Sequence, residues 1–166
     1  MGYELKADGL KDLNTMLDKL GDKALGVAAR ALYDGAGMMS EEIRKGAEGI
    51  KTAPFKYAST SRGEVRLPSP EEKEIVIAAG AGIAKFDKDP DGVQTSIGYS
   101  KAGYANLVGK VRPVQLIVNA INSGTSFMQK QPFIRKAGRA GSAKALKAMT
   151  DDIEKDFNEI INNGGK

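Results

Sequence analysis

The sequence predicts an α+β fold that is dominated by helices and forms a single domain. Two long segments, residues 23–51 and 132–163, place apolar side chains at intervals of three and four, which is typical of helices with one buried face. Between them, residues 93–99 alternate apolar and polar side chains as a half-buried strand does. The length of 166 residues fits one domain. We therefore expect long N-terminal and C-terminal helices packed on a small β-sheet, in a single domain over residues 1–166.

The first fifty residues predict one short strand and two helices. Residues 2–7 alternate in the manner of an edge strand, and leucines spaced by three and four predict a helix over residues 8–20. The longer helix over residues 23–51 has an apolar stripe of mostly small side chains. Gly35 and Gly37 lie within this stripe, where each costs about 1 kcal/mol of helix stability relative to alanine. Either the helix kinks there or a neighbouring segment comes close.

Residues 52–74 lack the periodicity of the helices. Three prolines and a run of small polar residues exclude a regular element through most of this segment, so we expect a long mobile loop or arm. Its last part, from Ser69 to Glu72, has the sequence of a helix start, with proline at the first helical position. Residues 75–79 either continue that helix or form a short strand, because their periodicity fits both.

An aspartate-rich segment precedes the predicted strand. Residues 87–92 match the first half of a calcium-binding EF-hand loop. The position that requires a bidentate glutamate is Gly98, however, and Pro90 stiffens the loop. We therefore expect a hairpin turn at this place and no metal site.

Composition excludes most common enzyme classes. The chain has no cysteine and no histidine, which excludes disulfides, thiolate or imidazole metal sites and serine–histidine triads. The glycine-containing segments 35–40 and 103–111 lack the spacing of phosphate-binding loops. Neither a membrane-spanning run nor the hydrophobic region of a signal peptide is present. We expect a soluble cytoplasmic protein that is not an enzyme and that has no cofactor, metal or membrane partner.

Positive charge is concentrated in one part of the chain. The net charge is only +4, but residues 101–150 carry nine lysines and arginines, and residues 92–150 contain no carboxylate. Such a segment is a solvated face, or it meets a nucleic-acid backbone or an acidic protein. Charge alone leaves these alternatives open. If the segment contacts a partner or channel DNA, we expect the contacts from Lys101, Lys110, Arg112, Lys130 and Lys136.

A turn between two predicted helices is the most distinctive motif. A short helix over residues 114–122 ends at Gly124, and Pro132 begins the final helix. The residues between them suit packing and offer no catalytic arrangement: Pro132 presets the helix entry, and Phe127 and Phe133 bracket and seat the turn. The residues that we assign to this turn and its packing are Gly124, Thr125, Ser126, Phe127, Pro132, Phe133 and Arg135.

The same segment resembles a known family. From Ser123 to Ala137 the sequence fits Ser-Gly-(Thr/Ser)-Ser-Phe-x-x-x-x-Pro-Phe-(Ile/Val)-Arg-x-Ala, a pattern similar to that of siphophage neck proteins, the head–tail joining or tail-completion proteins. The opening helix at residues 9–13, the alanine-rich second helix and the middle section agree with the branch from phages of Gram-positive hosts. The sequence departs from the pattern at Asn122, where many members carry glutamate, so a subunit contact made by that glutamate would differ here.

The resemblance implies a structural virion protein without enzymatic activity. Such a protein belongs to the phage neck or upper tail, is present in the host cytoplasm during assembly, and joins the DNA-filled head to the tail. It is expected to form a homo-oligomer, a hexameric ring around the DNA channel. Its implied partners are connector or head-closure proteins, tail-terminator or tail-tube proteins, and double-stranded DNA that passes without sequence-specific contact. The alternative is a basic DNA-binding or packaging accessory protein, although the chain has neither a recognition-helix signature nor an aromatic stacking platform.

Overall fold

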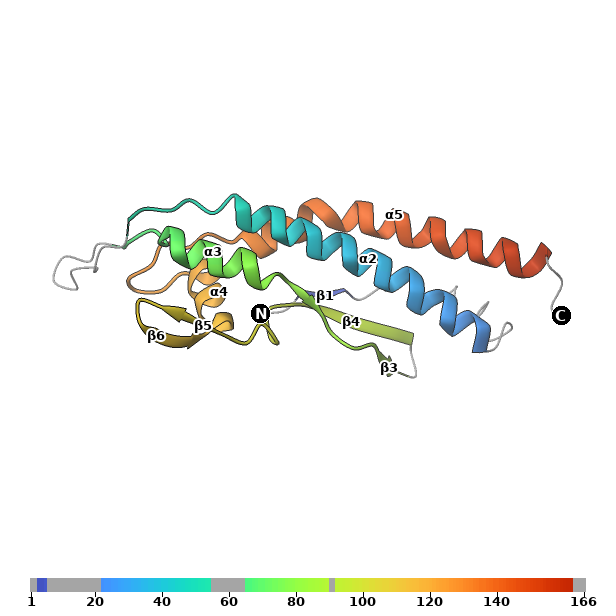
Figure 1. Cartoon of the computed structure of the whole chain (residues 1–166). Coiled ribbons are helices and arrows are strands. Elements are labelled where there is room, and N and C mark those ends of the chain that lie inside the picture. The colour runs from blue at the N-terminus through green and yellow to red at the C-terminus, as the bar shows by residue number, and fades with distance from the viewer. Residues whose placement is uncertain (1–2, 6–21, 55–64, 90–91, 163–166) are drawn as a thin grey trace.

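The predicted α+β architecture is confirmed by a computed structural model, which describes residues 3–5, 22–54, 65–89 and 92–162 (Figure 1). Its helices are α2 (Asp22–Glu48), α3 (Pro70–Ala79), α4 (Val114–Ser123) and α5 (Phe133–Asn162). Its strands are β1 (Tyr3–Leu5), β2 (Gly82–Ile83), β3 (Asp87–Asp89), β4 (Gly92–Gly98), β5 (Tyr104–Leu107) and β6 (Lys110–Pro113). The helix expected over residues 8–20 lies outside the described residues. The two long helices α2 and α5 lie side by side, and the strands lie to one side of them.

The central strand of the main sheet is β4, at the place where the alternating pattern predicts a strand. The predicted edge strand is confirmed, because β1 pairs antiparallel with one side of β4. Along the other side, β2 pairs with the end of β4 and β3 with its beginning. Pairing of Asp89 with Gly92 encloses residues 90–91, so the predicted hairpin before β4 is confirmed, although those two residues lie outside the described ranges.

The long helices α2 and α5 run in opposite directions and approach closely. A Cβ placed on Gly46 would lie 3.2 Å from the carbonyl oxygen of Phe133, and one on Gly141 would lie 2.9 Å from the sulfur of Met39. Near the other end of the pair, Arg30 and Asp156 form an ion pair of 3.1 Å. The predicted stripe of α2 is buried from Val27 to Ala47, because its small side chains let α5 come close.

The two glycines in this stripe should respond differently to substitution. A Cβ on Gly35 would overlap the side chain of buried Met149, whereas nothing lies within 4 Å of a Cβ on Gly37. Gly37→Ala should therefore raise the free energy of unfolding by about 1 kcal/mol through helix propensity alone. Gly35→Ala should lower it, because Met149 must leave its packed position. Chemical denaturation measures both variants, and equal stabilisation of the two would contradict the close approach at Gly35.

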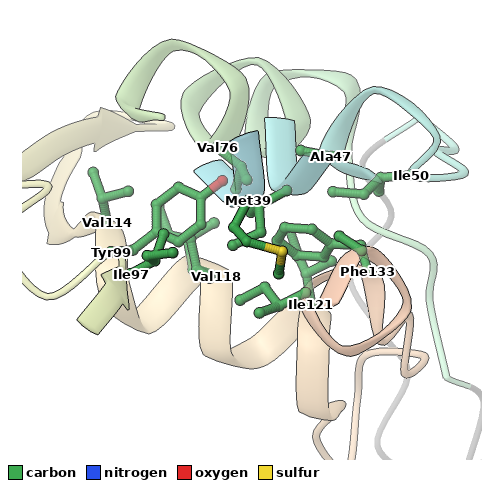
Figure 2. Packing of buried hydrophobic residues seen from close by; sticks show 14 of the residues in the cluster. Met39, Ala47, Ile50, Val76, Ile97, Tyr99, Val114, Val118, Ile121 and Phe133 are labelled. Atoms are coloured by element: carbon green, nitrogen blue, oxygen red, sulfur yellow. The ribbon is translucent and has the colours of Figure 1, made fainter. Parts of the chain in front are cut away.

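The main core lies between the helices and the sheets. Met39 of α2, Tyr99 after β4 and Phe133 of α5 meet near its centre, with Val76 of α3 on one side and Ile121 of α4 on another (Figure 2). A smaller cluster, with Leu32, Met149 and Ile153 among its members, packs the other ends of α2 and α5. The long helix pair thus has an apolar core at each end, and only the larger one includes α3, α4 and β5.

One polar atom in the main core has no partner. The Tyr99 hydroxyl is buried and makes no hydrogen bond among the described residues, and its burial raises the pKa of Tyr99 to about 12. Because an unpaired buried hydroxyl costs free energy that a phenyl ring does not, Tyr99→Phe should leave the free energy of unfolding unchanged or raise it by about 1 kcal/mol. A marked loss of stability in denaturant titrations would mean that the hydroxyl has a partner.

The helix start predicted at Ser69 is also confirmed. The Ser69 hydroxyl accepts a hydrogen bond from the Glu72 N–H (3.1 Å), and the Glu72 carboxylate accepts one from the Ser69 N–H (2.7 Å), which forms a capping box. Residues 75–79 belong to this helix and not to a strand. Of the arm expected over residues 52–74, residues 55–64 lie outside the described ranges. The described flanks are joined by a hydrogen bond from the Ala53 N–H to the Pro68 carbonyl (3.0 Å).

Candidate interaction surface

The turn singled out in the sequence forms a joint between α4 and α5, which we call the α4–α5 joint (residues 122–133). Gly124 has a φ of 77°, and a Cβ there would lie 3.0 Å from Cβ of Lys130, so both conformation and space favour glycine. The Thr125 hydroxyl accepts hydrogen bonds from the N–H groups of Phe127 (3.3 Å) and Met128 (3.0 Å). These contacts close the turn, as expected for its Gly-Thr-Ser sequence.

The aromatic residue expected to seat the turn together with Phe133 is not buried. Phe133 is only 4% exposed and packs edge-on against Tyr99, with ring centroids 6.4 Å apart. Phe127 is 46% exposed, so its assignment as a packing residue is wrong. The bridge between Thr125 and Met128 places Phe127 at the tip of the turn and directs Met128 into the core instead. No periodic pattern in the sequence distinguishes these two neighbouring apolar residues.

Of the remaining residues of the predicted motif, Pro132 and Arg135 lie at the start of α5 and Ser126 lies in the turn. Pro132 is partly buried directly before the helix, while Ser126 and Arg135 are exposed. Asn122, the position that departs from the family pattern, accepts a hydrogen bond from the Ile134 N–H through its side-chain oxygen (3.2 Å). This side chain therefore satisfies one of the free amides in the first turn of α5, a role within the chain.

The α4–α5 joint is held from outside by the segment that precedes α3. The Arg66 N–H donates to the Phe127 carbonyl (3.0 Å), and the Gln129 N–H donates to the Arg66 carbonyl (2.8 Å). The Arg66 guanidinium also donates two hydrogen bonds to the Glu72 carboxylate, of 2.7 and 2.6 Å. The joint, residues 65–69 and α3 therefore form one connected unit. The sequence does not predict this pair, because Arg66 lies in a segment with no periodicity.

Glu72 is ionised in this unit despite its burial. Burial by itself would raise its pKa, but hydrogen bonds from Arg66 and from the Ser69 N–H, together with the charge of Arg66, hold the pKa below the usual value. The folded protein therefore stabilises the ionised form of the Glu72 carboxylate. This paired, hydrogen-bonded carboxylate joins Arg66 to the first turn of α3.

A second connection ties the joint to the end of α2. The side-chain amide of Gln131 accepts a hydrogen bond from the Lys51 N–H and donates one to the Lys51 carbonyl, each of 2.8 Å. The Gln131 N–H also donates to the Ile121 carbonyl at the end of α4 (2.8 Å). Gln131 thus links the segment that follows α2 to the end of α4, next to the start of α5. The sequence gives no signal for this role, because glutamine in a loop is usually solvated.

The five bases predicted to contact a partner are all exposed. Lys110 and Arg112 lie on β6, Lys101 lies in the loop after β4, and Lys130 and Lys136 lie in and just after the α4–α5 joint. The β5–β6 hairpin and the joint lie at the same end of the molecule, opposite the C-terminal end of α5 (Figure 1). The structure therefore places most of these bases at one end but does not gather them around a pocket.

The hollows that lie among the described residues near this surface are small. Two surface hollows, one beside Tyr99 and α4 and one beside β2, have volumes of about 30 and 90 Å³. Pockets for small-molecule substrates are usually about 300 Å³ or more. In the described ranges, no three acidic side chains are grouped so that they could hold a metal ion. Among the helices described here, none is long and apolar enough to span a membrane.

A hairpin that the sequence analysis did not predict lies beside the joint. Strands β5 and β6 pair antiparallel as a separate two-stranded sheet. Their turn, Val108–Gly109, has φ angles of 51° and 73°. Turns of this type usually contain Asn-Gly, because a β-branched residue is strained at positive φ. The sequence does not indicate this hairpin, because Val108 stands at the position where asparagine of an Asn-Gly turn is expected.

Replacement of the strained valine should stabilise the isolated protein. Asparagine adopts positive φ at lower cost, and Val108 is exposed, so its loss removes no core packing. Val108→Asn should raise the free energy of unfolding by about 1 kcal/mol. Denaturant titration measures this change, and Val108→Ala, which keeps a Cβ without the β-branch or the side-chain amide, serves as the control. Destabilisation by asparagine would contradict the assigned turn.

The chain matches no protein-family model, no curated protein and no solved structure.

Proposed function

We propose that the protein is a structural component of the phage neck or upper tail that joins the DNA-filled head to the tail. It acts as a homo-oligomer, a hexameric ring around the DNA channel, and contacts neighbouring connector or tail proteins. It is assembled in the host cytoplasm and remains in the virion. Double-stranded DNA passes it without sequence-specific contact, so any phosphate contact is weak and depends on salt.

One observation carries this proposal. The segment whose sequence resembles the neck proteins builds the α4–α5 joint. Hydrogen bonds connect that joint to Lys51 after α2 and to Arg66, and Arg66 in turn binds Glu72 of α3. A joint that is fixed by several hydrogen bonds suits a protein that transmits mechanical force between the rings of the neck. The exposed bases on and near it suit an acidic partner surface or the DNA in the channel.

The test is electron microscopy of lysates from a phage with a stop codon early in this gene. The proposal predicts filled heads beside separate or abnormal tails, and restoration of joined virions by the wild-type gene on a plasmid. A matched pair of complementing genes makes the test sharper: Phe127→Ala, at an exposed position, should restore virions, whereas Phe133→Ala, in the core, should not at elevated temperature. Joined, infectious virions without any complementation would exclude the structural role.

A basic DNA-binding or packaging accessory protein is the second candidate. Residues 92–150 contain no carboxylate, and the five predicted bases within them are all exposed. This function predicts duplex DNA binding that weakens by orders of magnitude between about 50 and 200 mM salt. Lys110→Ala/Arg112→Ala should weaken it, whereas Lys155→Ala, among the carboxylates of the C-terminal part of α5, should not. Absence of binding at low salt, measured by fluorescence anisotropy, would exclude this candidate.

A further inference from the structure

The side of α5 that points away from α2 is exposed along the helix. Met149 and Ile153 are buried against α2, whereas Lys136, Lys147 and Glu154 are exposed. At 3.6 residues per turn, these three exposed positions differ by no more than about 20° around the helix axis, so they share one face. In Figure 1, this helix lies on the side of the molecule away from β4, which packs on α2 instead.

The charges of α5 divide into two halves. Residues 133–150 carry five bases and no carboxylate, whereas residues 151–162 carry five carboxylates and one lysine. We call the exposed side opposite α2 the outer α5 face. Its charged side chains are Lys136, Arg139, Lys144 and Lys147 in the basic half and Asp151 and Glu154 in the acidic half.

The stability of α5 itself does not explain this order of charges. The helix dipole favours carboxylates in the first turn of a helix and bases in the last turn. The first turn of α5 has no carboxylate and its last turn has no base. Instead, Arg135 and Lys136 lie in the first turn and Glu159 lies in the last. Because the charges oppose the dipole at both ends, they indicate a contact outside the helix.

The neighbouring helix α2 does not supply this contact. Its carboxylates Glu41, Glu42 and Glu48 pair with bases of α2 itself. Arg30 of α2 does reach α5, but it binds Asp156, on the side that faces α2. Among the described residues, no charged side chain of the outer α5 face forms an ion pair. Both halves of the face are therefore available to a partner.

A second copy of this chain complements both halves at once. If its α5 runs antiparallel, one register places Lys147 of each copy opposite Asp151 of the other and Lys144 opposite Glu154, because both pairs are centred on the same point of the helix. The exposed Ala143 lies on the same face, and its small side chain lets the two helices approach closely. Each pair occurs twice, so the contact joins opposite charges along most of the helix.

Duplex DNA complements only one half of this face. Its phosphates would be attracted by the basic half, but Asp151 and Glu154 would repel them on the same side of the same helix. A partner that covers the whole face must carry the two charge signs in the opposite order. The antiparallel α5 of a second copy has this order.

We propose that two copies of this chain associate in solution through their outer α5 faces, antiparallel, so that the basic half of each helix binds the acidic half of the other. The contact is isologous, since both copies use the same face, and it closes with two copies. It goes beyond the proposed function, because a ring requires a different, head-to-tail contact. The dimer is the form of the free protein before it enters a ring.

The first experiment uses charge-reversed forms of the full chain in sedimentation velocity at low salt. One form carries Lys144→Glu and Lys147→Glu, and the other carries Asp151→Lys and Glu154→Lys. Wild type should dimerise as concentration rises, and each reversed form alone should dimerise at least tenfold more weakly. An equimolar mixture should regain the wild-type affinity, because each helix then meets one of opposite charge.

A matched control makes the same change of charge away from the outer α5 face. Lys110→Glu/Arg112→Glu, on exposed positions of β6, should leave dimerisation unchanged. Dimerisation of the wild type should also weaken at about 1 M salt, because exposed charges are then screened. Circular dichroism checks that each variant is folded, and the mixture and the cysteine variants below keep the test valid if one reversed form fails to fold.

Single cysteine variants test the register, because the chain has no cysteine of its own. Thr150→Cys lies near the two-fold axis and should give a disulfide-linked dimer under mild oxidation. Ala140→Cys and Asn158→Cys should each fail to cross-link alone, since each lies about 27 Å along the helix from its own counterpart. A mixture of these two should cross-link, because position 140 of one copy meets position 158 of the other. Met38→Cys, at an exposed position on α2, is the control that should not cross-link.

The outcomes separate this inference from the proposed function. A dimer that survives in both reversed forms, a mixture that does not recover, or cross-linking in another register would overturn the α5–α5 contact. A wild type that stays monomeric at low salt would also overturn it, and duplex DNA binding lost in Lys144→Glu/Lys147→Glu would then assign the basic half to DNA. Each of these results leaves the neck function standing. Joined virions in the absence of the protein would exclude the neck function whatever the sedimentation result.

Discussion

Phe133→Ala should lower the free energy of unfolding by about 3–5 kcal/mol, as large-to-small changes of buried aromatic residues do. The ring is buried, packs edge-on against Tyr99 and belongs to the same cluster as Met39 and Ile121 (Figure 2). Its loss leaves a cavity at the point where α5 begins. For a chain of this length, the melting temperature should fall by roughly 6–20 °C.

Phe127→Ala provides the matched control for this change. It deletes the same side chain at a neighbouring place in the same joint, but from a position that is half exposed. Its effect should stay below about 1 kcal/mol, because little buried area is lost. Thermal and denaturant unfolding should therefore separate the two variants clearly. Equal effects, or an unchanged melting temperature for Phe133→Ala, would contradict the packing assigned to the joint.

Glu72→Gln should cost about 3–5 kcal/mol, the usual penalty when one partner of a buried ion pair is removed. The substitution removes the Glu72 carboxylate from the Arg66 guanidinium, whose side chain is only 13% exposed. Glu41→Gln is the control, since Glu41 pairs with Arg44 on the exposed surface of α2, and such pairs contribute less than about 1 kcal/mol. The double variant Arg66→Met/Glu72→Leu should lose much less than the sum of the single changes.

The same carboxylate predicts how stability depends on pH. The pKa of Glu72 in the folded protein lies below its usual value of 4.5. The stability that its charged form contributes is therefore complete above that value and is lost as pH falls through the folded pKa. The difference in unfolding free energy between wild type and Glu72→Gln should narrow from pH 7 to pH 3. A difference that stays constant over this range would show that the carboxylate charge does not stabilise the joint.

The long elements of the fold could be predicted because their apolar residues recur at regular intervals along the sequence. The stripe of α2 and the alternation of β4 each extend over enough residues to fix both type and position. The hairpin β5–β6 could not be predicted, because Val108 stands where an Asn-Gly turn would give the signal. Strand β2 is only two residues long and owes its conformation to pairing with β4. Such pairing is a long-range effect that no local pattern records.

In the α4–α5 joint, too, the local features could be predicted from the sequence and the long-range contacts could not. The glycine and threonine of the joint act locally, so their residue types indicate the turn. Met128, which is buried where Phe127 is not, also forms a bridge to Arg66, which lies 62 residues earlier in the chain. Likewise, the link from Gln131 to Lys51 joins residues separated by 80 positions. Contacts of this kind follow from tertiary packing, and single-sequence reasoning has no access to them.

The antiparallel pairing of α2 with α5 also has a consequence for the order of folding during synthesis. Residues 49–132 separate the two helices, so α2 leaves the ribosome long before the helix that covers its apolar stripe. Until α5 has been translated, Val27, Leu32 and Met39 lack much of the packing that buries them in the finished fold. Contacts between such distant segments form late and slowly. The nascent chain is therefore exposed to aggregation over most of its synthesis, and completion of the last helix is the step that protects it.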